Sequence, residues 1–363
     1  MIQPSDYFVQ SYDEARSKFR QSAQNAKADQ RIYLNPGPGA DGEDLTCDTA
    51  WLGNPDAGCV LVTISGTHGV EGFCGSGVQA GWFRSGLAKE MPEDVALLAI
   101  HAINPHGFSW LRRVTEENVD LNRNFIDFSL TPPENPGYDE LASAIQLKVW
   151  DEESIAEANK IIEAYGEAYG NRALQQAISG GQYRHPKGIF YGGTAPTWAH
   201  KTLKEIFSTQ LKNAKRVAVI DYHTGLGPRG YGERICVHAP ESSSLARADS
   251  WYDGDLTSPA LGTSSSVELS GFNVIGMEEA LGADKELTAV ALEYGTQPTS
   301  MVRLALRADN WLHHHGDLQS AKARKIKRQI RDAFYQDEND WKEMIWERGI
   351  ETQRQAIDGL IER

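Results

Sequence analysis

The sequence is poor in cysteine. Its 363 residues include only four, Cys47, Cys59, Cys74 and Cys236, and no two of them form a C-x-x-C pair. Scattered cysteines of this kind exclude a disulfide framework and a zinc ribbon, and they are typical of reduced, partly buried thiols. The sequence also has no apolar run near the roughly 18 residues that a membrane-spanning helix needs. We therefore expect neither a disulfide-stapled fold nor a transmembrane segment.

Basic residues are also in short supply. Lys and Arg number 36 against 50 Asp and Glu, which gives a formal net charge of −14. Such a chain repels phosphate backbones and anionic lipid head groups, so nucleic acid and membrane are not expected partners. The opening residues, Met1 to Asp6, lack the basic and apolar segments of a secretory signal. Together with the free cysteines, this pattern predicts a cytoplasmic protein.

Several common enzyme motifs are missing. The sequence has no G-x-x-x-x-G-K-[ST] and no G-x-S-x-G, which weighs against a P-loop nucleotidase and a serine hydrolase. A G-x-G-x-x-G pattern occurs from Gly225 to Gly230, but Pro228 and the strand-like residues after it leave no helix to hold a pyrophosphate. We interpret it as a turn. His313 to His315 point in different directions on a helix and do not predict a metal site.

Apolar runs alternate with amphipathic segments along the chain. Residues 95–100 and 217–220 are continuously apolar, as expected for central strands covered on both faces. The pattern predicts an α/β fold with three layers, a mixed, mostly parallel central sheet flanked by helices. Residues 1–363 are expected to form a single domain, with a helical insertion at about 130–215 and a helical tail at about 317–363. The expected strands are 45–51, 59–64, 95–100, 216–222, 234–238 and 287–294, and the expected helices are 12–26, 71–89, 138–179 and 197–211.

Two of the expected strands lead into histidines. His68 and Glu71 follow the strand 59–64 at a spacing of three, in a glycine-rich turn that permits sharp backbone geometry. His223 ends another buried strand, and the carboxyl ends of strands in open α/β sheets gather the active-site groups. Neutral imidazole and carboxylate are ligands of catalytic Zn²⁺. Taken singly, His68 also fits a histidine paired with an acid at a helix start, and His223 also fits a core histidine.

Two further segments concentrate polar chemistry. The run from Asn118 to Phe125 carries Asn122 and Arg123, whose amide and guanidinium can hold a carboxylate or polarise a carbonyl. A polar loop with solvated charges is the alternative interpretation. Glu293 lies at the end of an apolar strand, where an ionised side chain is costly unless it has a partner or a chemical role.

These motifs together resemble the M14 zinc carboxypeptidase family. The resemblance rests on His68-x-x-Glu71, the run 120–125, His223 and Glu293, in that order and at strand ends. The chain is particularly similar to the DUF2817 branch, in which the runs G-T-H-G-V-E-G (66–72) and H-T-G-L-G (223–227) recur. The similarity covers roughly residues 60–296 and leaves the inserted helices and the tail outside it. It implies the zinc carboxypeptidase fold.

The resemblance implies one zinc ion per chain, held by His68, Glu71 and His223. Asp120 would then be a carboxylate that fixes the ring of His68, in keeping with the outer acceptor that a metal-bound imidazole needs.

The same resemblance implies roles for the remaining motif residues. Arg113 would stabilise the developing oxyanion, with neighbouring Arg112 as the alternative for this role. Asn122 and Arg123 would bind the terminal carboxylate of a substrate, and Glu293 would be the general base.

The implied activity is hydrolysis of an amide or peptide bond next to a free carboxylate, on a small peptide. The family usually supplies a tyrosine some twenty residues before the catalytic glutamate, whereas no tyrosine lies between Tyr252 and Tyr294. The alternative is therefore an N-acyl-amino-acid amidohydrolase of the aspartoacylase and succinylglutamate desuccinylase type. A non-catalytic metal-containing binding protein is the third and less favoured interpretation, because every core position is filled.

Overall fold

The computed structural model describes residues 3–362, so Met1 and Ile2, which begin the segment inspected for a signal, and Arg363 lie outside it. Within the described residues a seven-stranded sheet has the order β1-β2-β4-β3-β5-β7-β6. Its strands are β1 (Asp29–Pro38), β2 (Asp44–Leu52), β3 (Cys59–Ile64), β4 (Val95–His101), β5 (Arg216–Arg229), β6 (Gly232–Ile235) and β7 (Glu286–Gly295).

The four central strands, β4, β3, β5 and β7, are mutually parallel, and β2 and β6 pair antiparallel with them at the two sides. β1 adds a further antiparallel pairing, at the edge beyond β2. The predicted α/β class with a mixed sheet is therefore confirmed. In β4 every residue is buried, as expected for a strand covered on both faces.

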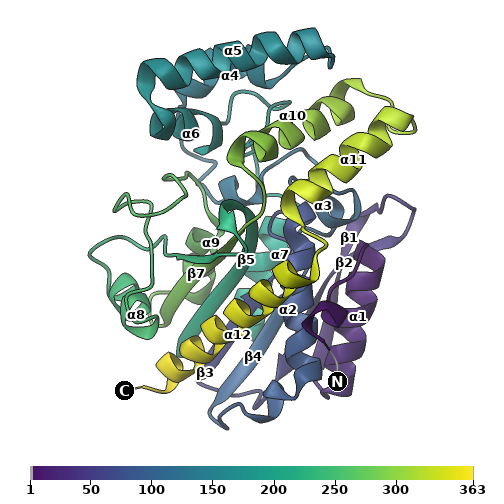
Figure 1. Cartoon of the computed structure of the whole chain (residues 1–363). Helices are drawn as coiled ribbons and strands as arrows, with labels where there is room; N and C mark the ends of the chain where they lie inside the picture. Colours follow the sequence, from purple (N-terminus) through teal and green to yellow (C-terminus); the bar gives the residue numbers. More distant parts are fainter. Residues whose placement is uncertain (1–2, 363) are drawn as a thin grey trace.

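The two faces of the sheet are covered by different helices (Figure 1). Because side chains alternate along a strand, Leu61 of β3 faces one hydrophobic cluster, while Val60 and Val62 face another. The first face is covered by α1 (Tyr12–Asn25), α2 (Gly72–Ser85), α8 (Ser243–Trp251) and α12 (Asn339–Ile361), and the second by α7 (Trp198–Gln210) and α9 (Asn273–Leu281). These three layers bury the sheet on both sides.

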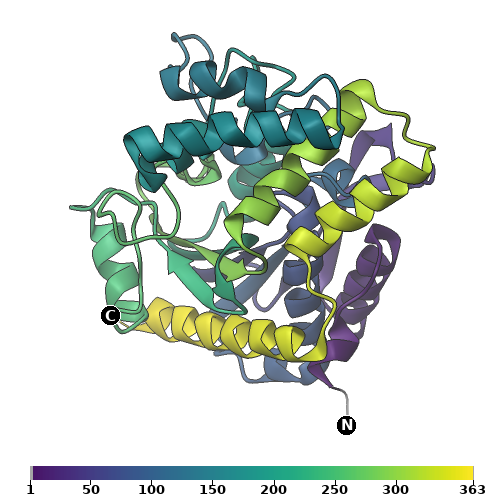
Figure 2. The ribbon, with the colours of Figure 1, turned by 45° about the horizontal axis from the view of Figure 1, so that its top comes forward.

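A further group of helices lies over the end of the sheet at which β3 and β7 terminate, as Figure 2 shows. These helices are α4 (Pro136–Ile145), α5 (Glu152–Tyr169), α6 (Asn171–Ser179), α10 (Thr299–His315) and α11 (Ala321–Phe334), while the short α3 (Pro105–Ser109) packs near β1 and β2. The buried apolar residues of α4, α5, α6, α10 and α11 belong to two hydrophobic clusters that are separate from those on the sheet faces. The stretch expected as helix over 138–179 is thus three helices, and α7, farther along, packs on the sheet. None of the helices in residues 3–362 combines the length and the apolarity that crossing a membrane requires.

Trp341 of α12 provides a test of this packing. Its indole is fully buried and donates a hydrogen bond of 3.0 Å to the carbonyl oxygen of Gly295, at the end of β7. Replacing it with alanine should lower the free energy of unfolding by about 3–5 kcal/mol, because the large cavity cannot collapse completely. Glu343→Ala, an exposed change on the same helix, should stay within about 0.5 kcal/mol in the same denaturant titration. Equal losses of unfolding free energy in Trp341→Ala and Glu343→Ala would contradict the packing of α12 described above.

Candidate active site

The turn after β3 brings His68 and Glu71 to the sheet edge. Backbone N–H groups of Gly69 and Val70 donate to the carbonyl oxygens of Arg113 and Arg112, at 3.2 and 2.8 Å. A Cβ atom at position 69 would lie 2.0 Å from the backbone carbon of Gly107, so only glycine allows this close approach. These contacts fix the turn against the arginine-bearing segment, which places Arg113 beside Glu71.

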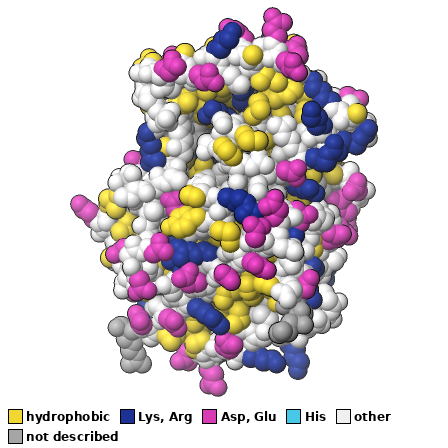
Figure 3. Space-filling view, in the orientation of Figure 1, with side chains coloured by type: hydrophobic (Ala, Val, Ile, Leu, Met, Phe, Trp, Pro, Cys, Tyr) yellow, Lys and Arg dark blue, Asp and Glu magenta, His cyan; other side chains and the backbone are white. Residues whose placement is uncertain are grey.

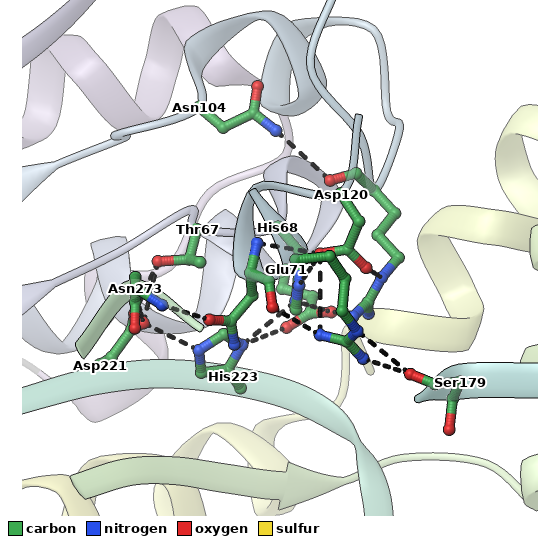
Figure 4. A network of polar contacts seen from close by, with 12 residues as sticks. Thr67, His68, Glu71, Asn104, Asp120, Ser179, Asp221, His223 and Asn273 are labelled. Atoms are coloured by element: carbon green, nitrogen blue, oxygen red, sulfur yellow. Dashed lines mark hydrogen bonds and ion pairs between the residues drawn. The ribbon is translucent and has the colours of Figure 1, made fainter. Parts of the chain in front are cut away.

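Three side chains converge at this edge, as Figure 4 shows. Nδ1 of His68 lies 3.0 Å from Oε1 of Glu71 and 3.2 Å from Nδ1 of His223. Nδ1 of His223 lies 3.2 Å from Oε2 of Glu71. Within residues 3–362, these three buried residues are the group of His, Cys, Asp and Glu side chains close enough to share a metal ion. The structure therefore brings together all three ligands that the sequence predicts.

Carboxylates on the outer side of both imidazoles determine how the rings are protonated. Nε2 of His68 lies 3.1 Å from Oδ1 of Asp120. Nε2 of His223 lies 2.9 Å from Oδ2 of Asp221, a close ion-pair contact that is not well aligned as a hydrogen bond. We assign a proton to Nε2 in each ring because a carboxylate oxygen lies beside it. The two Nδ1 atoms then remain for a metal ion beside Glu71, and without a metal a proton on Nδ1 of His223 is donated to the Glu71 carboxylate.

This donor set fits a divalent metal ion. Two imidazole nitrogens and a carboxylate are the protein ligands of many catalytic zinc sites, and they leave a fourth position open. Zinc bonds of about 2.0–2.1 Å in a tetrahedral site place ligand atoms about 3.3–3.4 Å apart, close to the separations of 3.0–3.2 Å between these three side chains. A cation there would take the place of the proton that otherwise lies between His223 and Glu71.

Neighbouring charges favour the ionised form of Glu71 and the protonated form of His223 in spite of their burial. Burial alone would raise the pKa of Glu71, but charge interaction with His68 and hydrogen bonding from His223 outweigh it and hold that pKa well below its ordinary value. Burial opposes protonation of His223, yet the carboxylates of Asp221 and Glu71 raise its pKa well above the ordinary range. The pocket thus favours positive charge between these side chains, which is the condition for holding a cation.

The two adjacent arginines have different surroundings. Arg113 donates from Nε to Asp120 at 2.8 Å and from a terminal nitrogen to Glu71 at 3.1 Å, and it lines the cavity above the cluster. Arg112 turns away and contacts Asp309 and Asn118 at 3.2 and 2.9 Å. Of the two candidates for an arginine that stabilises an oxyanion, the geometry therefore favours Arg113.

Asn122 and Arg123 also line the cavity, with most of their polar atoms already engaged. Arg123 donates to the carbonyl oxygens of Ser179 and of Asn122 itself, with distances between 2.6 and 3.1 Å. Burial lowers its pKa to about 10. The side-chain oxygen of Asn122 accepts from the backbone N–H of Asn273 at 3.0 Å, so its amide nitrogen remains as the donor available to a ligand.

Glu293 lies one strand away from the cluster. It pairs in register with His223 across β5 and β7, which places both side chains on the same face of the sheet. Its Oε1 accepts from the backbone N–H of Leu226 at 3.0 Å. Burial, reinforced by the charge of Glu71, raises the pKa of Glu293 to about 8. A carboxyl group with such a pKa can exchange a proton near neutral pH.

A cavity of about 490 Å³ opens above these side chains. His68, Arg113, His223 and Glu293 lie on its wall, together with residues of α6, α9 and α10 and the loop 265–272. The volume is in the range of small-molecule sites, which are about 300–1,000 Å³. Figure 3 shows the molecule in the orientation of Figure 1, with hydrophobic side chains gathered in its upper part, over the region of α6 and α10. The site therefore combines a polar floor with largely apolar walls.

The structure adds two residues to those that the motifs named, Asp221 and Phe190. Asp221 precedes His223 by two positions on β5, and this spacing places both side chains on one face of the sheet. Thr67 and Asn273 donate hydrogen bonds of 2.6–3.0 Å to the carboxylate of Asp221 (Figure 4). Phe190 has a φ of 58°, rare for a bulky residue, and its ring lies 4.9 Å from the guanidinium of Arg113. The strand period could have indicated Asp221, whereas nothing in the sequence marks Phe190.

The fold and the site define an α/β protein with a candidate metal centre at the carboxyl edge of its sheet. Residues 8–348 match the model of the family described as "Protein of unknown function (DUF2817)", so the chain belongs to that family. The similarity to this family noted from the motifs is thereby confirmed. A search of curated proteins finds no match.

Solved structures similar to this chain include bovine thrombin-activatable fibrinolysis inhibitor, in complex with tick carboxypeptidase inhibitor. That chain is 11% identical, with 90% of this chain and 97% of that one covered and a TM-score of 0.44. The ectoine utilization protein EutE (DoeB) from Ruegeria pomeroyi is 15% identical, with 80% and 67% covered and a TM-score of 0.38. The succinylglutamate desuccinylase from Chromobacterium violaceum is 13% identical, with 84% and 74% covered and a TM-score of 0.37.

Metal binding is the first test of the site. The protein should bind one zinc ion per chain, measured by elemental analysis after gel filtration, and His223→Ala should abolish stoichiometric binding. Asp221→Asn should weaken zinc affinity by about 10–100-fold in a chelator competition, because it removes the carboxylate that orients a ligand ring.

The control for this test is His315→Ala, on the exposed histidine at the end of α10. It should leave the zinc content unchanged. Zinc lost from His315→Ala but retained by His223→Ala would place the metal at the run of histidines 313–315 and overturn the assignment.

Proposed function

We propose that the protein is a zinc-dependent hydrolase that cleaves an amide or peptide bond next to a free carboxylate. The observation that carries the proposal is the convergence of Nδ1 of His68, Nδ1 of His223 and the carboxylate of Glu71 beneath a cavity of about 490 Å³, with buried Glu293 on the adjacent strand. When bound there, zinc lowers the pKa of a water molecule and polarises a carbonyl oxygen.

The other residues of the cavity have complementary tasks in this proposal. Glu293 accepts the proton of the attacking water and later returns it to the leaving amine, which suits a carboxyl group whose pKa is raised to about 8. Arg113 stays protonated, since Asp120 and Glu71 raise its pKa against the effect of burial, and its guanidinium stabilises the oxyanion that develops on the carbonyl. Asn122 and Arg123 hold the carboxylate next to the scissile bond.

Glu293→Gln should separate binding from turnover. The substitution keeps the shape of the side chain but removes the proton acceptor, so the variant should retain stoichiometric zinc and lose about 10²–10⁴-fold in kcat on dipeptide or N-acyl-amino-acid substrates. Glu286→Gln, at the exposed beginning of the same strand, loses only a surface ion pair with Arg216 at 3.2 Å and should retain full activity. An active Glu293→Gln protein would remove Glu293 from the mechanism.

The pH dependence of kcat/KM should report the ionisation of Glu293. In the absence of metal the pKa of Glu293 lies at about 8, against an ordinary value of 4.5, because burial and Glu71 disfavour its charge. A bound divalent cation favours the carboxylate, so kcat/KM should rise with pH along a one-proton limb with its midpoint between these two values. Rates measured from pH 4 to 9 check this, and a flat profile above pH 5 would contradict it.

Hydrolysis of N-acyl amino acids is the second candidate function. Ser265 and Ser266, in the loop before α9, line the cavity, and no tyrosine occurs between Tyr252 and Tyr294. Rates on free dipeptides and on N-acetylated and N-succinylated amino acids distinguish the two activities. Equal rates on free-acid and amidated substrates would count against the carboxylate role of Asn122 and Arg123. Bound zinc without any hydrolysis would favour a binding protein instead.

A further inference from the structure

Arg303 projects from α10 into the wall of the same cavity as His223 and Glu293. Ser300, one turn earlier on the helix, and Leu306, one turn later, also line the cavity, so this face of α10 is directed toward it. The side chain of Arg303 is part-buried rather than free in solvent. The described residues thus place on the cavity wall an arginine that neither the sequence motifs nor the proposed mechanism uses.

Among the residues that the structure describes, the guanidinium of Arg303 has no hydrogen-bond or ion-pair partner. Within residues 3–362 it makes no hydrogen bond to another side chain or to a backbone carbonyl, and no carboxylate lies within ion-pair distance. Arg307, one turn away, instead donates to Asn159 and to the carbonyl oxygen of Ala144, both at 2.8 Å. Glu163 interacts with Arg303 only through longer-range charge, and burial lowers the pKa of Arg303. An unpartnered, part-buried cation costs free energy, which an anionic ligand would recover.

The surroundings of Arg303 limit what that ligand can be. Leu174 and Ile178 of α6, Leu269 of the loop and Met277 of α9 contribute apolar surface to the cavity. Arg303 and Arg307 lie four residues apart on one helix, and like charges at this spacing repel, so an anion beside Arg303 also relieves that repulsion. A planar guanidinium matches the two oxygens of a carboxylate.

We propose that Arg303 is a second carboxylate-binding residue and that the site takes dicarboxylic ligands. Their two acidic groups are separated by an apolar segment that lies along the apolar walls. One carboxylate occupies the position next to the metal cluster, Arg113 and Arg123, and the other meets Arg303. This inference rests on the proposed function for the first position and deepens it, because it specifies the substrate class: amides whose acyl or amino part carries an additional acidic group.

Binding of linear dicarboxylic acids tests the proposal without turnover. Isothermal titration of the zinc-loaded protein with acids of four to eight carbons, each beside the monocarboxylic acid of equal length, should show one or more dicarboxylates that bind at least about tenfold more tightly. Arg303→Gln should remove that preference and leave monocarboxylate affinity within about twofold. Arg303→Lys should restore part of the preference, since it keeps the charge but not the planar fork.

Arg328→Gln on α11 is the matched control, because it removes one positive charge outside the cavity, and it should bind like the unchanged protein. The proposal fails if no dicarboxylate binds better than its monocarboxylate counterpart, or if Arg303→Gln retains the preference. A protein that shows the preference but hydrolyses no amide would refute the hydrolase and leave the role of Arg303 standing. A protein that hydrolyses amides but shows no preference for dicarboxylates would refute the role of Arg303 and leave the hydrolase standing.

Discussion

The site depends on the convergence of one ring nitrogen from each of His68 and His223 and the carboxylate of Glu71 on a single buried point. Asp120 and Asp221 take the outer nitrogens of the rings, which leaves both Nδ1 atoms facing inward, 3.2 Å apart. A buried arrangement of this kind is costly unless a cation occupies it. The surrounding fold supplies the constraint that keeps the side chains in place, since three parallel strands end at the same edge and the turn after β3 is bonded to the segment of Arg113.

The layers of the fold explain how this polar cluster coexists with a stable protein. The two sheet faces are closed by α1, α2 and α12 on one side and by α7 and α9 on the other, so the polar groups collect only at the strand ends. Helices α6 and α10 and the end of α11 then supply apolar walls above the cluster, and α4 and α5 pack behind them. Low polarity around Glu293 raises its pKa and strengthens every charge interaction in the cavity, which links the architecture directly to the chemistry.

The sequence predicted what depends on local pattern. Continuous apolar runs identified β4 and β5, and His68, His223 and Glu293 follow or end strands of the sheet, where the sequence placed them. The edge strand β1 was not predicted because prolines and exposed residues interrupt its pattern, which an edge position tolerates. Helix α10 was not predicted, since it begins after Pro298 without the capping side chain that would mark its start in the sequence. Arg303 and Phe190 reach the cavity only through the packing of distant helices and loops, which no local spacing encodes.

The most direct test of the account is the anomalous scattering of zinc in a crystal of the metal-loaded protein. We expect one strong peak in the metal centre, about 2.0–2.1 Å from Nδ1 of His68 and of His223 and within bonding distance of the Glu71 carboxylate. A peak bound through Nε2, or a peak elsewhere with these three side chains still in contact with each other, would contradict it.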